Sequence, residues 1–170
     1  MAKRHRPNVV LMDIRFPDSS GLNAIDELRL EVPEAKIIVL SAYDNPTYIA
    51  RAAAMGASDY LSKGCSREQI LTAIHAAVEG TGPQSNSLLR EIDDTMKSKK
   101  SPDDTNSGLT KRETQVLRHV ALGLNNREIG LSLGISVETV KEHVQHVLQK
   151  ISTTDRTRAA IWAIRNGFVD

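Results

Sequence analysis

The sequence predicts two parts of different fold class: an α/β part with three parallel strands and helices, and an all-α part built on a helix-turn-helix. In the first part, three short apolar runs are each followed by a helical pattern. This order is typical of a parallel sheet that helices cover on both faces. In the second part every pattern is helical. The apolar runs lie at residues 8–12, 36–40 and 57–63.

The stretch between these parts has the composition of a linker. It contains the segments SNS, KSKK and SPDDTNSG, which are rich in Ser, Lys and Asp. Such clusters interrupt periodic segments and mark loops. We therefore predict an α/β domain over residues 1–80, a linker over 81–108 and a helical DNA-binding domain over 109–170.

Composition limits the class of protein. The 170 residues include a single cysteine, which excludes an internal disulfide and suits a reducing cytoplasm. No apolar run approaches the roughly 18 residues that a membrane span needs, so no membrane partner is expected. Residues 109–170 carry nine Lys and Arg against six Asp and Glu, a basic excess that favours nucleic acid.

The helices of the α/β part are expected at residues 21–31, 46–55 and 66–78. Ser66 and Gln69 have the spacing of a capping box. Asn45 before Pro46 is typical of an N-cap followed by proline at the first helical position. The linker is predicted to contain a helix over about 87–98, followed by a flexible stretch that ends at Gly108.

Four capped helices are predicted after residue 109. Capping boxes open two of them, at Thr110 with Glu113 and at Asn125 with Glu128. Ser136 and Asp155 are expected to cap the third and fourth helices. The third helix has an apolar seam at Val140, Val144, Val147, Leu148 and Ile151.

The polar face of the third helix is a candidate DNA-reading surface. With its seam turned inward, Lys141, Glu142 and Gln145 point outward and can pair with guanine, cytosine and adenine. Residues that flank this face are placed for phosphates, namely Thr139, His146 and Lys150. Any amphipathic helix has a polar outer face. The glycine turn at residues 133–136 and the capped neighbours favour the DNA-reading interpretation.

The motifs of this part resemble the LuxR/NarL-type helix-turn-helix of FixJ-like response regulators. They are Leu109-Thr110-Lys111-Arg112-Glu113, Gly123-Leu124-Asn125-Asn126-Arg127-Glu128-Ile129, and the run from Leu133 to Val144. The resemblance implies a transcriptional regulator whose last helix pairs two copies. The expected dimer contacts are Arg156, Ala159, Trp162 and Ala163. Trp162 fits core filling equally well.

The α/β part resembles the flavodoxin-like receiver domain of response regulators. Asp13, followed by Ile14-Arg15-Phe16-Pro17 and Gly21, resembles the phosphoacceptor region. The resemblance further implies switch roles for Ser41, Tyr60 and Lys63. Polar groups at the carboxyl ends of parallel strands are where such sheets build their sites.

The resemblance begins late in the receiver pattern, so we predict an N-terminally truncated receiver. The first strand, helix and second strand are not found, nor is the acidic pair that would hold Mg²⁺ beside Asp13. We therefore expect no cofactor and no control by conventional Mg²⁺-dependent phosphorylation. The strand at residues 8–13 would be an exposed edge, which a second chain can cover.

Two functions remain open at this point. The first is a transcription factor that binds double-stranded DNA as a homodimer and is no enzyme. The second is an interaction protein that dimerises with full-length response regulators and titrates them. The resemblance also implies a sensor histidine kinase as a partner.

Overall fold

The computed structural model describes residues 2–16, 19–42, 44–84, 87–97 and 108–169, with side chains from residue 24 onward and before residue 15. Its chain contacts divide into two compact units, Met1–Ile92 and Asp93–Asp170. The predicted linker over 81–108 includes residues outside the described ranges, among them its flexible stretch. The predicted domain boundaries therefore stay predictions.

The first unit is built on a parallel sheet of three strands in the order β1-β4-β5. The strands are β1 (Val9–Asp13), β4 (Lys36–Ser41) and β5 (Asp59–Ser62). β1 pairs with β4 so that Asp13 is opposite Leu40, and Ser41 is opposite Ser62 of β5. The sequence-based expectation of three parallel strands is confirmed. β1 lies at an edge of this sheet, with Leu11 44% exposed.

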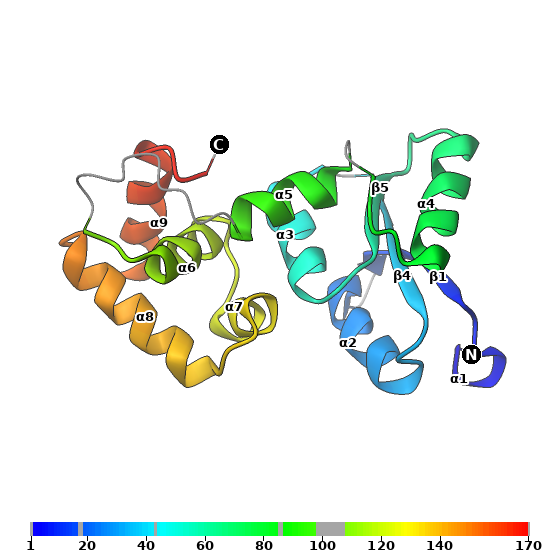
Figure 1. Cartoon of the computed structure of the whole chain (residues 1–170), viewed down its shortest axis with the longest axis horizontal. Helices are drawn as coiled ribbons and strands as arrows, with labels where there is room; N and C mark the ends of the chain where they lie inside the picture. The colour runs from blue at the N-terminus through cyan, green and yellow to red at the C-terminus, as the bar shows by residue number, and fades with distance from the viewer. Residues whose placement is uncertain (1, 17–18, 43, 85–86, 98–107, 170) are drawn as a thin grey trace. The chain divides into compact units, whose positions relative to one another are not determined.

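Helices cover both faces of the sheet, as Figure 1 shows. They are α2 (Gly21–Glu31) and α3 (Pro46–Ala54) on one face and α4 (Arg67–Glu79) on the other. Alternation along β4 explains this arrangement. Ile37 and Val39 join the apolar cluster that contains Ile25 and Ile49, whereas Ile38 packs with α4.

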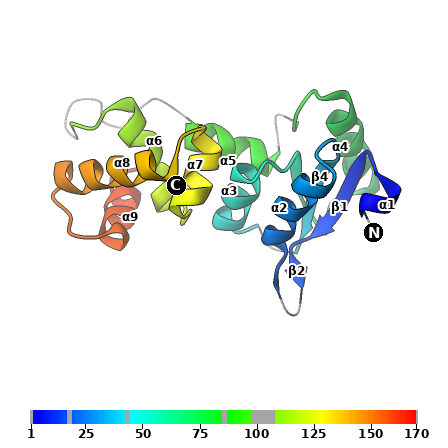
Figure 2. The same ribbon diagram turned by 90° about the horizontal axis from the view of Figure 1, so that it is seen from below.

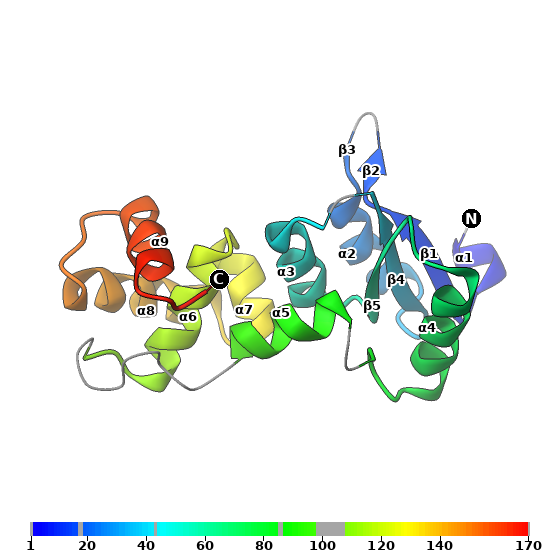
Figure 3. The ribbon, with the colours of Figure 1, turned by 90° about the horizontal axis from the view of Figure 1, so that it is seen from above.

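Two short elements were not predicted. α1 (Ala2–His5) is a single helical turn, and a two-stranded antiparallel ribbon follows β1. The ribbon pairs β2 (Arg15–Phe16) with β3 (Ser19–Ser20) and projects from the sheet, as both turned views show (Figures 2 and 3). Strands of two residues are too short to show alternating polarity.

Helix α5 (Leu88–Lys97) confirms the helix predicted near residues 87–98. Its N-terminal residues Leu88, Leu89 and Ile92 pack with the apolar cluster of the first unit. The side chain of Leu89 is 5% exposed. This part of α5 thus belongs to the core of the first unit.

The second unit is helical in its described residues, and the four helices predicted after residue 109 begin at their predicted caps. They are α6 (Lys111–Ala121), α7 (Asn126–Leu133), α8 (Val137–Lys150) and α9 (Arg156–Arg165). The N-caps are Thr110, Asn125, Ser136 and Asp155. α6 is the central helix, because residues 113–120 are all buried.

Two polar side chains of α6, the buried Arg118 and the half-buried Arg112, connect it to its surroundings. Nε of Arg118 donates to the carbonyl oxygen of Phe168 at 3.0 Å. Nη2 of Arg112 donates to the carbonyl oxygen of Leu133 at 2.8 Å, at the end of α7. These bonds satisfy polar groups that burial would otherwise leave unpaired. None of the described helices is long and apolar enough to cross a membrane.

Candidate functional site

Helix α8 carries the predicted DNA-reading face. Its N-terminus is capped by Ser136, whose Oγ accepts a hydrogen bond from the backbone N–H of Thr139 at 3.1 Å. Val140 and Val147 are buried at 0% and 2% exposure. The seam therefore fixes which side of α8 faces inward, and the opposite side remains open.

The outer face of α8 is polar and accessible. The outward residues of the prediction, Lys141, Glu142 and Gln145, are all exposed, and so are Glu138 and Gln149. Nζ of Lys141 lies 2.8 Å from Oε1 of Glu138, with the two side chains 53% and 76% exposed. Such a surface ion pair contributes little to stability. Both side chains can therefore rearrange toward a ligand.

The turn before α8 depends on two glycines. The backbone N–H of Ile135 donates to the carbonyl oxygen of Gly130 at 3.0 Å. A Cβ atom on Gly130 would lie 2.8 Å from the carbonyl oxygen of Ile135. Gly134 adopts a left-handed conformation with φ of 64° and ends α7. The close approach at Gly130 lets α7 and α8 meet as a helix-turn-helix.

The predicted phosphate contacts differ in their surroundings. His146 is exposed on α8. The hydroxyl of Thr139 is 2.9 Å from Oγ of Ser136 and so takes part in the cap. Nζ of Lys150 lies 2.7 Å from Oε2 of Glu113, whose side chain is 5% exposed. Lys150 is thus bonded inside the second unit, which the sequence-based prediction did not anticipate.

The predicted dimer contacts need correction. Ala159 and Ala163 are 2% and 0% exposed and belong to an apolar cluster with Leu117 and Phe168. Small residues permit close packing within a domain as well as between chains, and here they pack within it. Ala159 and Ala163 are therefore not a free surface of α9.

The other two predicted dimer contacts also make internal contacts. Arg156 donates to Oδ1 of Asn126 at 2.9 Å and to the carbonyl oxygen of Leu124. The Trp162 ring is half-buried, with its centroid 5.4 Å from that of Phe168. Core filling, the alternative left open for Trp162, thus describes its position in this unit.

The apolar residues that α9 does expose were missed. Ile161 and Ile164 are 44% and 53% exposed. They are three residues apart, so they are neighbours on the helix surface. The two isoleucines are three residues apart and lie on the side of α9 away from the buried alanines. This pattern is the sequence signal that predicts an exposed apolar face.

In the first unit, the predicted receiver residues meet at the carboxyl ends of the strands. Asp13 ends β1, Ser41 ends β4 and Lys63 follows β5. Nζ of Lys63 forms an ion pair with Oδ2 of Asp13, and both side chains are accessible at 49% and 33% exposure. The backbone N–H of Lys63 donates to the carbonyl oxygen of Ser41 at 2.7 Å.

Ser41 and Tyr60 form the buried part of this site. They are 0% and 1% exposed, and their side chains are hydrogen-bonded. Burial raises the pKa of Tyr60 above its ordinary value, although the bond with Ser41 acts in the opposite direction. Both hydroxyls are therefore buried neutral groups, whereas the Asp13–Lys63 pair is accessible. In the described ranges, no three or more His, Cys, Asp and Glu side chains are grouped to hold a metal ion.

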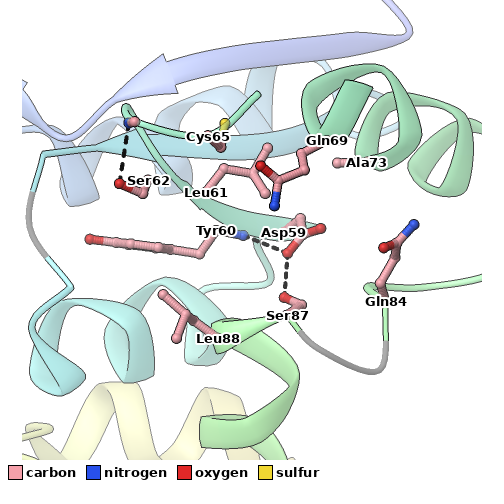
Figure 4. Close-up of a pocket in the computed structure, with 11 residues that line it drawn as sticks. Asp59, Tyr60, Leu61, Ser62, Cys65, Gln69, Ala73, Gln84, Ser87 and Leu88 are labelled. Carbon is pink, nitrogen blue, oxygen red and sulfur yellow. Dashed lines mark hydrogen bonds between the residues drawn. The ribbon is translucent and has the colours of Figure 1, made fainter. Parts of the chain in front are cut away.

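A cavity of about 310 Å³ lies beside β5 in the same unit. Figure 4 shows that Asp59, Ser62, Cys65, Gln69 and Ser87 line it. Its polar groups largely bond to one another: Oδ1 of Asp59 accepts from the Tyr60 backbone N–H at 2.8 Å and from the Ser87 hydroxyl at 2.6 Å. Pro17, a residue of the predicted phosphoacceptor motif, lies outside the described residues.

Comparison with known families identifies both units. The response regulator receiver domain matches residues 1–75, and the luxR family of bacterial regulatory proteins matches residues 107–163. The chain is 36% identical over 172 residues to the uncharacterized transcriptional regulatory protein YxjL of Bacillus subtilis, covering 99% of this chain and 79% of that protein.

Two further relatives have similar coverage. The transcriptional regulatory protein LnrK of B. subtilis is 34% identical over 174 residues, covering 98% of this chain and 79% of LnrK. The transcriptional regulatory protein DegU of Brevibacillus brevis is 31% identical over 184 residues, covering 99% and 78%.

Fold, site and relatives together define a DNA-binding transcriptional regulator of the response-regulator type. Within that class, the chain belongs to the response regulators that carry a LuxR-type helix-turn-helix domain. The resemblance predicted from the motifs around Asp13 and α8 is thereby confirmed.

Proposed function

We propose that this protein binds double-stranded DNA as a homodimer, with α8 of each copy in the major groove. The observation that carries the proposal is the division of α8 into a buried seam and an exposed polar face. Lys141, Glu142 and Gln145 would contact base edges, because their side chains match the donors and acceptors of the bases. Thr139 and His146 would contact phosphates beside them.

The homodimer is proposed to form through α9. Ile161 and Ile164 expose apolar surface beside the half-buried Trp162. Neighbouring apolar side chains on a helix gain free energy when a second copy covers them. Two recognition helices held by one dimer would contact two half-sites, as helix-turn-helix dimers do.

DNA binding is proposed not to require conventional Mg²⁺-dependent phosphorylation of Asp13. The carboxylate of Asp13 already pairs with Lys63. Mg²⁺ prefers near-octahedral oxygen ligation, usually with one or two carboxylates plus phosphate. A sensor histidine kinase would then be a partner that duplex binding does not require. The protein would act in the cytoplasm.

The exposed face of α8 favours DNA reading over the alternative, in which the chain only titrates full-length response regulators. A titrating protein needs a dimer surface but has no use for outward Lys141 and Gln145 beside a capped helix-turn-helix. We therefore propose no second function.

Duplex binding at increasing KCl concentration tests the proposal. Fluorescence anisotropy with a duplex selected from a random pool should show affinity that falls as salt rises. Lys141→Ala should weaken binding and relax the sequence preference at one position. The exposed Lys36 of β4 supplies the matched control, and Lys36→Ala should bind like the wild type. Absence of salt-dependent duplex binding would refute the proposed function.

Phosphorylation is tested separately. The protein is incubated with Mg²⁺ and a small-molecule phosphoryl donor, and its intact mass and duplex affinity are measured. The expected result is an unchanged mass and an unchanged affinity. A stable phosphoryl group on Asp13 that strengthens duplex binding would contradict independence from phosphorylation.

A further inference from the structure

The last residue of α8 is bonded to the first turn of α6. Nζ of Lys150 lies 2.7 Å from Oε2 of Glu113, and the two side chains are 37% and 5% exposed. The charge of this lysine is therefore balanced by a largely buried carboxylate. The carboxylate 2.7 Å away partly cancels the field that this lysine presents to a phosphate.

Glu113 is itself held in place. Its Oε2 also accepts from the backbone N–H of Thr110 at 2.6 Å, and Oγ1 of Thr110 accepts from the backbone N–H of Glu113 at 3.2 Å. Burial raises the pKa of Glu113, but the hydrogen bonds from Lys150 and Thr110 leave the pKa below its usual value. The carboxylate is thus an ionised acceptor whose position is set by the start of α6.

The remaining contacts of α8 with the core are mostly apolar. Val140 and Val147 are buried in the seam, and Ile151 follows the helix at 8% exposure. Apolar burial is non-directional, so it holds α8 against the core with less angular preference than a hydrogen bond has. The bond from Lys150 to Glu113 is directional and lies at the opposite end of α8 from the Ser136 cap.

We propose that Lys150 is a positioning residue of the DNA-reading helix rather than a phosphate contact. Its bond to Glu113 holds the C-terminal end of α8 on α6, and thereby sets the orientation in which Lys141 and Gln145 meet base edges. The proposal rests on the proposed function, in which α8 reads duplex DNA. It replaces the phosphate role predicted for Lys150 from the sequence.

The full chain tests this role through the salt dependence of duplex binding. Lys150→Ala should weaken binding to the selected duplex roughly tenfold, and binding to unselected duplex much less. Its plot of log affinity against log salt should keep the wild-type slope. Lys150→Arg should restore selective binding, because a guanidinium also bonds a carboxylate. In the matched control Lys141→Ala, the loss of selectivity should be confined to one base position.

A phosphate contact gives the opposite pattern. Lys150→Ala would then weaken selected and unselected duplexes equally, and its slope would fall by about 0.9. That result would overturn the proposal.

A second measurement does not depend on DNA. Trp162 is the single tryptophan, so its fluorescence reports urea unfolding of the second unit. Lys150→Ala should lower the urea midpoint, and adding Glu113→Gln should recover part of the loss, because the buried charge is then removed. Additive effects of the two changes would show that the residues are not coupled and would overturn the proposal.

The two measurements separate the possible failures. If urea unfolding shows that Lys150 and Glu113 are coupled but the wild-type protein binds no duplex, the proposed function is refuted and the contact itself is established. Coupling without any change in duplex selectivity would overturn the positioning role, because the bond would then only stabilise the fold.

Discussion

The hydroxyl of Ser87 donates a hydrogen bond of 2.6 Å to Oδ1 of Asp59, which joins the start of α5 to the start of β5. The same oxygen accepts from the backbone N–H of Tyr60, and Asp59 is 3% exposed (Figure 4). Oγ of Ser87 also accepts from the backbone N–H of Leu89 at 3.2 Å. One buried carboxylate thus fixes the N-terminal part of α5 next to the strand that carries Tyr60.

Ser87→Ala should loosen the N-terminal part of α5. The change leaves a buried carboxylate with one fewer donor, which typically costs about 1–3 kcal/mol. Hydrogen exchange by mass spectrometry should show faster exchange in the peptide that covers residues 88–92.

Ser62→Ala is the control for this variant, because its hydroxyl accepts only a 3.3 Å bond from the backbone N–H of Gly64. It should leave exchange in residues 88–92 unchanged. Equal exchange in wild type and Ser87→Ala would show that the Ser87–Asp59 bond does not hold α5.

Gly130→Ala should destabilise the helix-turn-helix. The new Cβ would lie 2.8 Å from a backbone oxygen, which cannot rotate away as a side chain can. Overpacking of this kind costs about 1–3 kcal/mol, and alanine recovers up to about 1 kcal/mol through its helix propensity. Urea unfolding followed by Trp162 fluorescence should show a lower midpoint.

Leu131→Ala is the matched change on the next residue of α7, where the side chain is 50% exposed. Its midpoint should stay near that of the wild type. A stability of Gly130→Ala equal to the wild type would mean that α7 and the turn separate without cost.

Local features of this chain could be predicted from the sequence, and so could the meeting of Asp13 and Lys63 at the strand ends, whereas the partner of Lys150 could not. The capping boxes at Thr110 and Asn125 join residues three apart, so their spacing is visible in the sequence. Lys150 and Glu113 are 37 residues apart, and an amphipathic pattern places lysine on the outer face of α8 without naming a partner.

The alanines of α9 show a different limit. Small side chains fit a close contact inside a domain as well as one between two chains. The sequence therefore did not distinguish a dimer contact from core packing at Ala159 and Ala163. The packing of Leu117 and Phe168 against these alanines makes that distinction.

The second unit should lose stability as the pH falls below 6.5. His119 is 0% exposed, and burial lowers its pKa from 6.5 to about 4. Its Nδ1–H donates to the carbonyl oxygen of Gln115 at 2.7 Å, so Nε2, 2.8 Å from Oγ of Ser132, is an acceptor. The charged groups that act on it are Asp93, Lys97 and Arg112.

The sign follows from proton binding. Between pH 6.5 and about 4, unfolded His119 binds a proton that the folded side chain does not, so the free energy of unfolding falls as the pH decreases. The loss amounts to about 3 kcal/mol over this range. Urea unfolding followed by Trp162 fluorescence at several pH values measures it.

His119→Gln isolates this contribution, because glutamine keeps a donor and an acceptor but does not titrate in this range. The variant should be less stable than the wild type at pH 7 and should show a smaller loss between pH 6.5 and about 4. The same pH dependence in both proteins would assign the loss to other groups.

Ile161→Glu combined with Ile164→Glu should give a folded monomer. Both side chains are exposed in the single chain, at 44% and 53%, so charges there cost the fold little. In a dimer through α9, the same carboxylates would face one another across an apolar contact and disfavour association. Sedimentation velocity should show the wild type as a dimer and the variant as a monomer.

Duplex affinity connects this change to function. A monomer contacts one half-site, so the variant should bind the selected duplex much more weakly while its Trp162 fluorescence and urea midpoint stay near those of the wild type. Leu131→Glu is the matched control, since Leu131 is similarly exposed at 50% but lies on α7. It should remain dimeric. A double variant that still sediments as a dimer would exclude this face of α9 as the dimer contact.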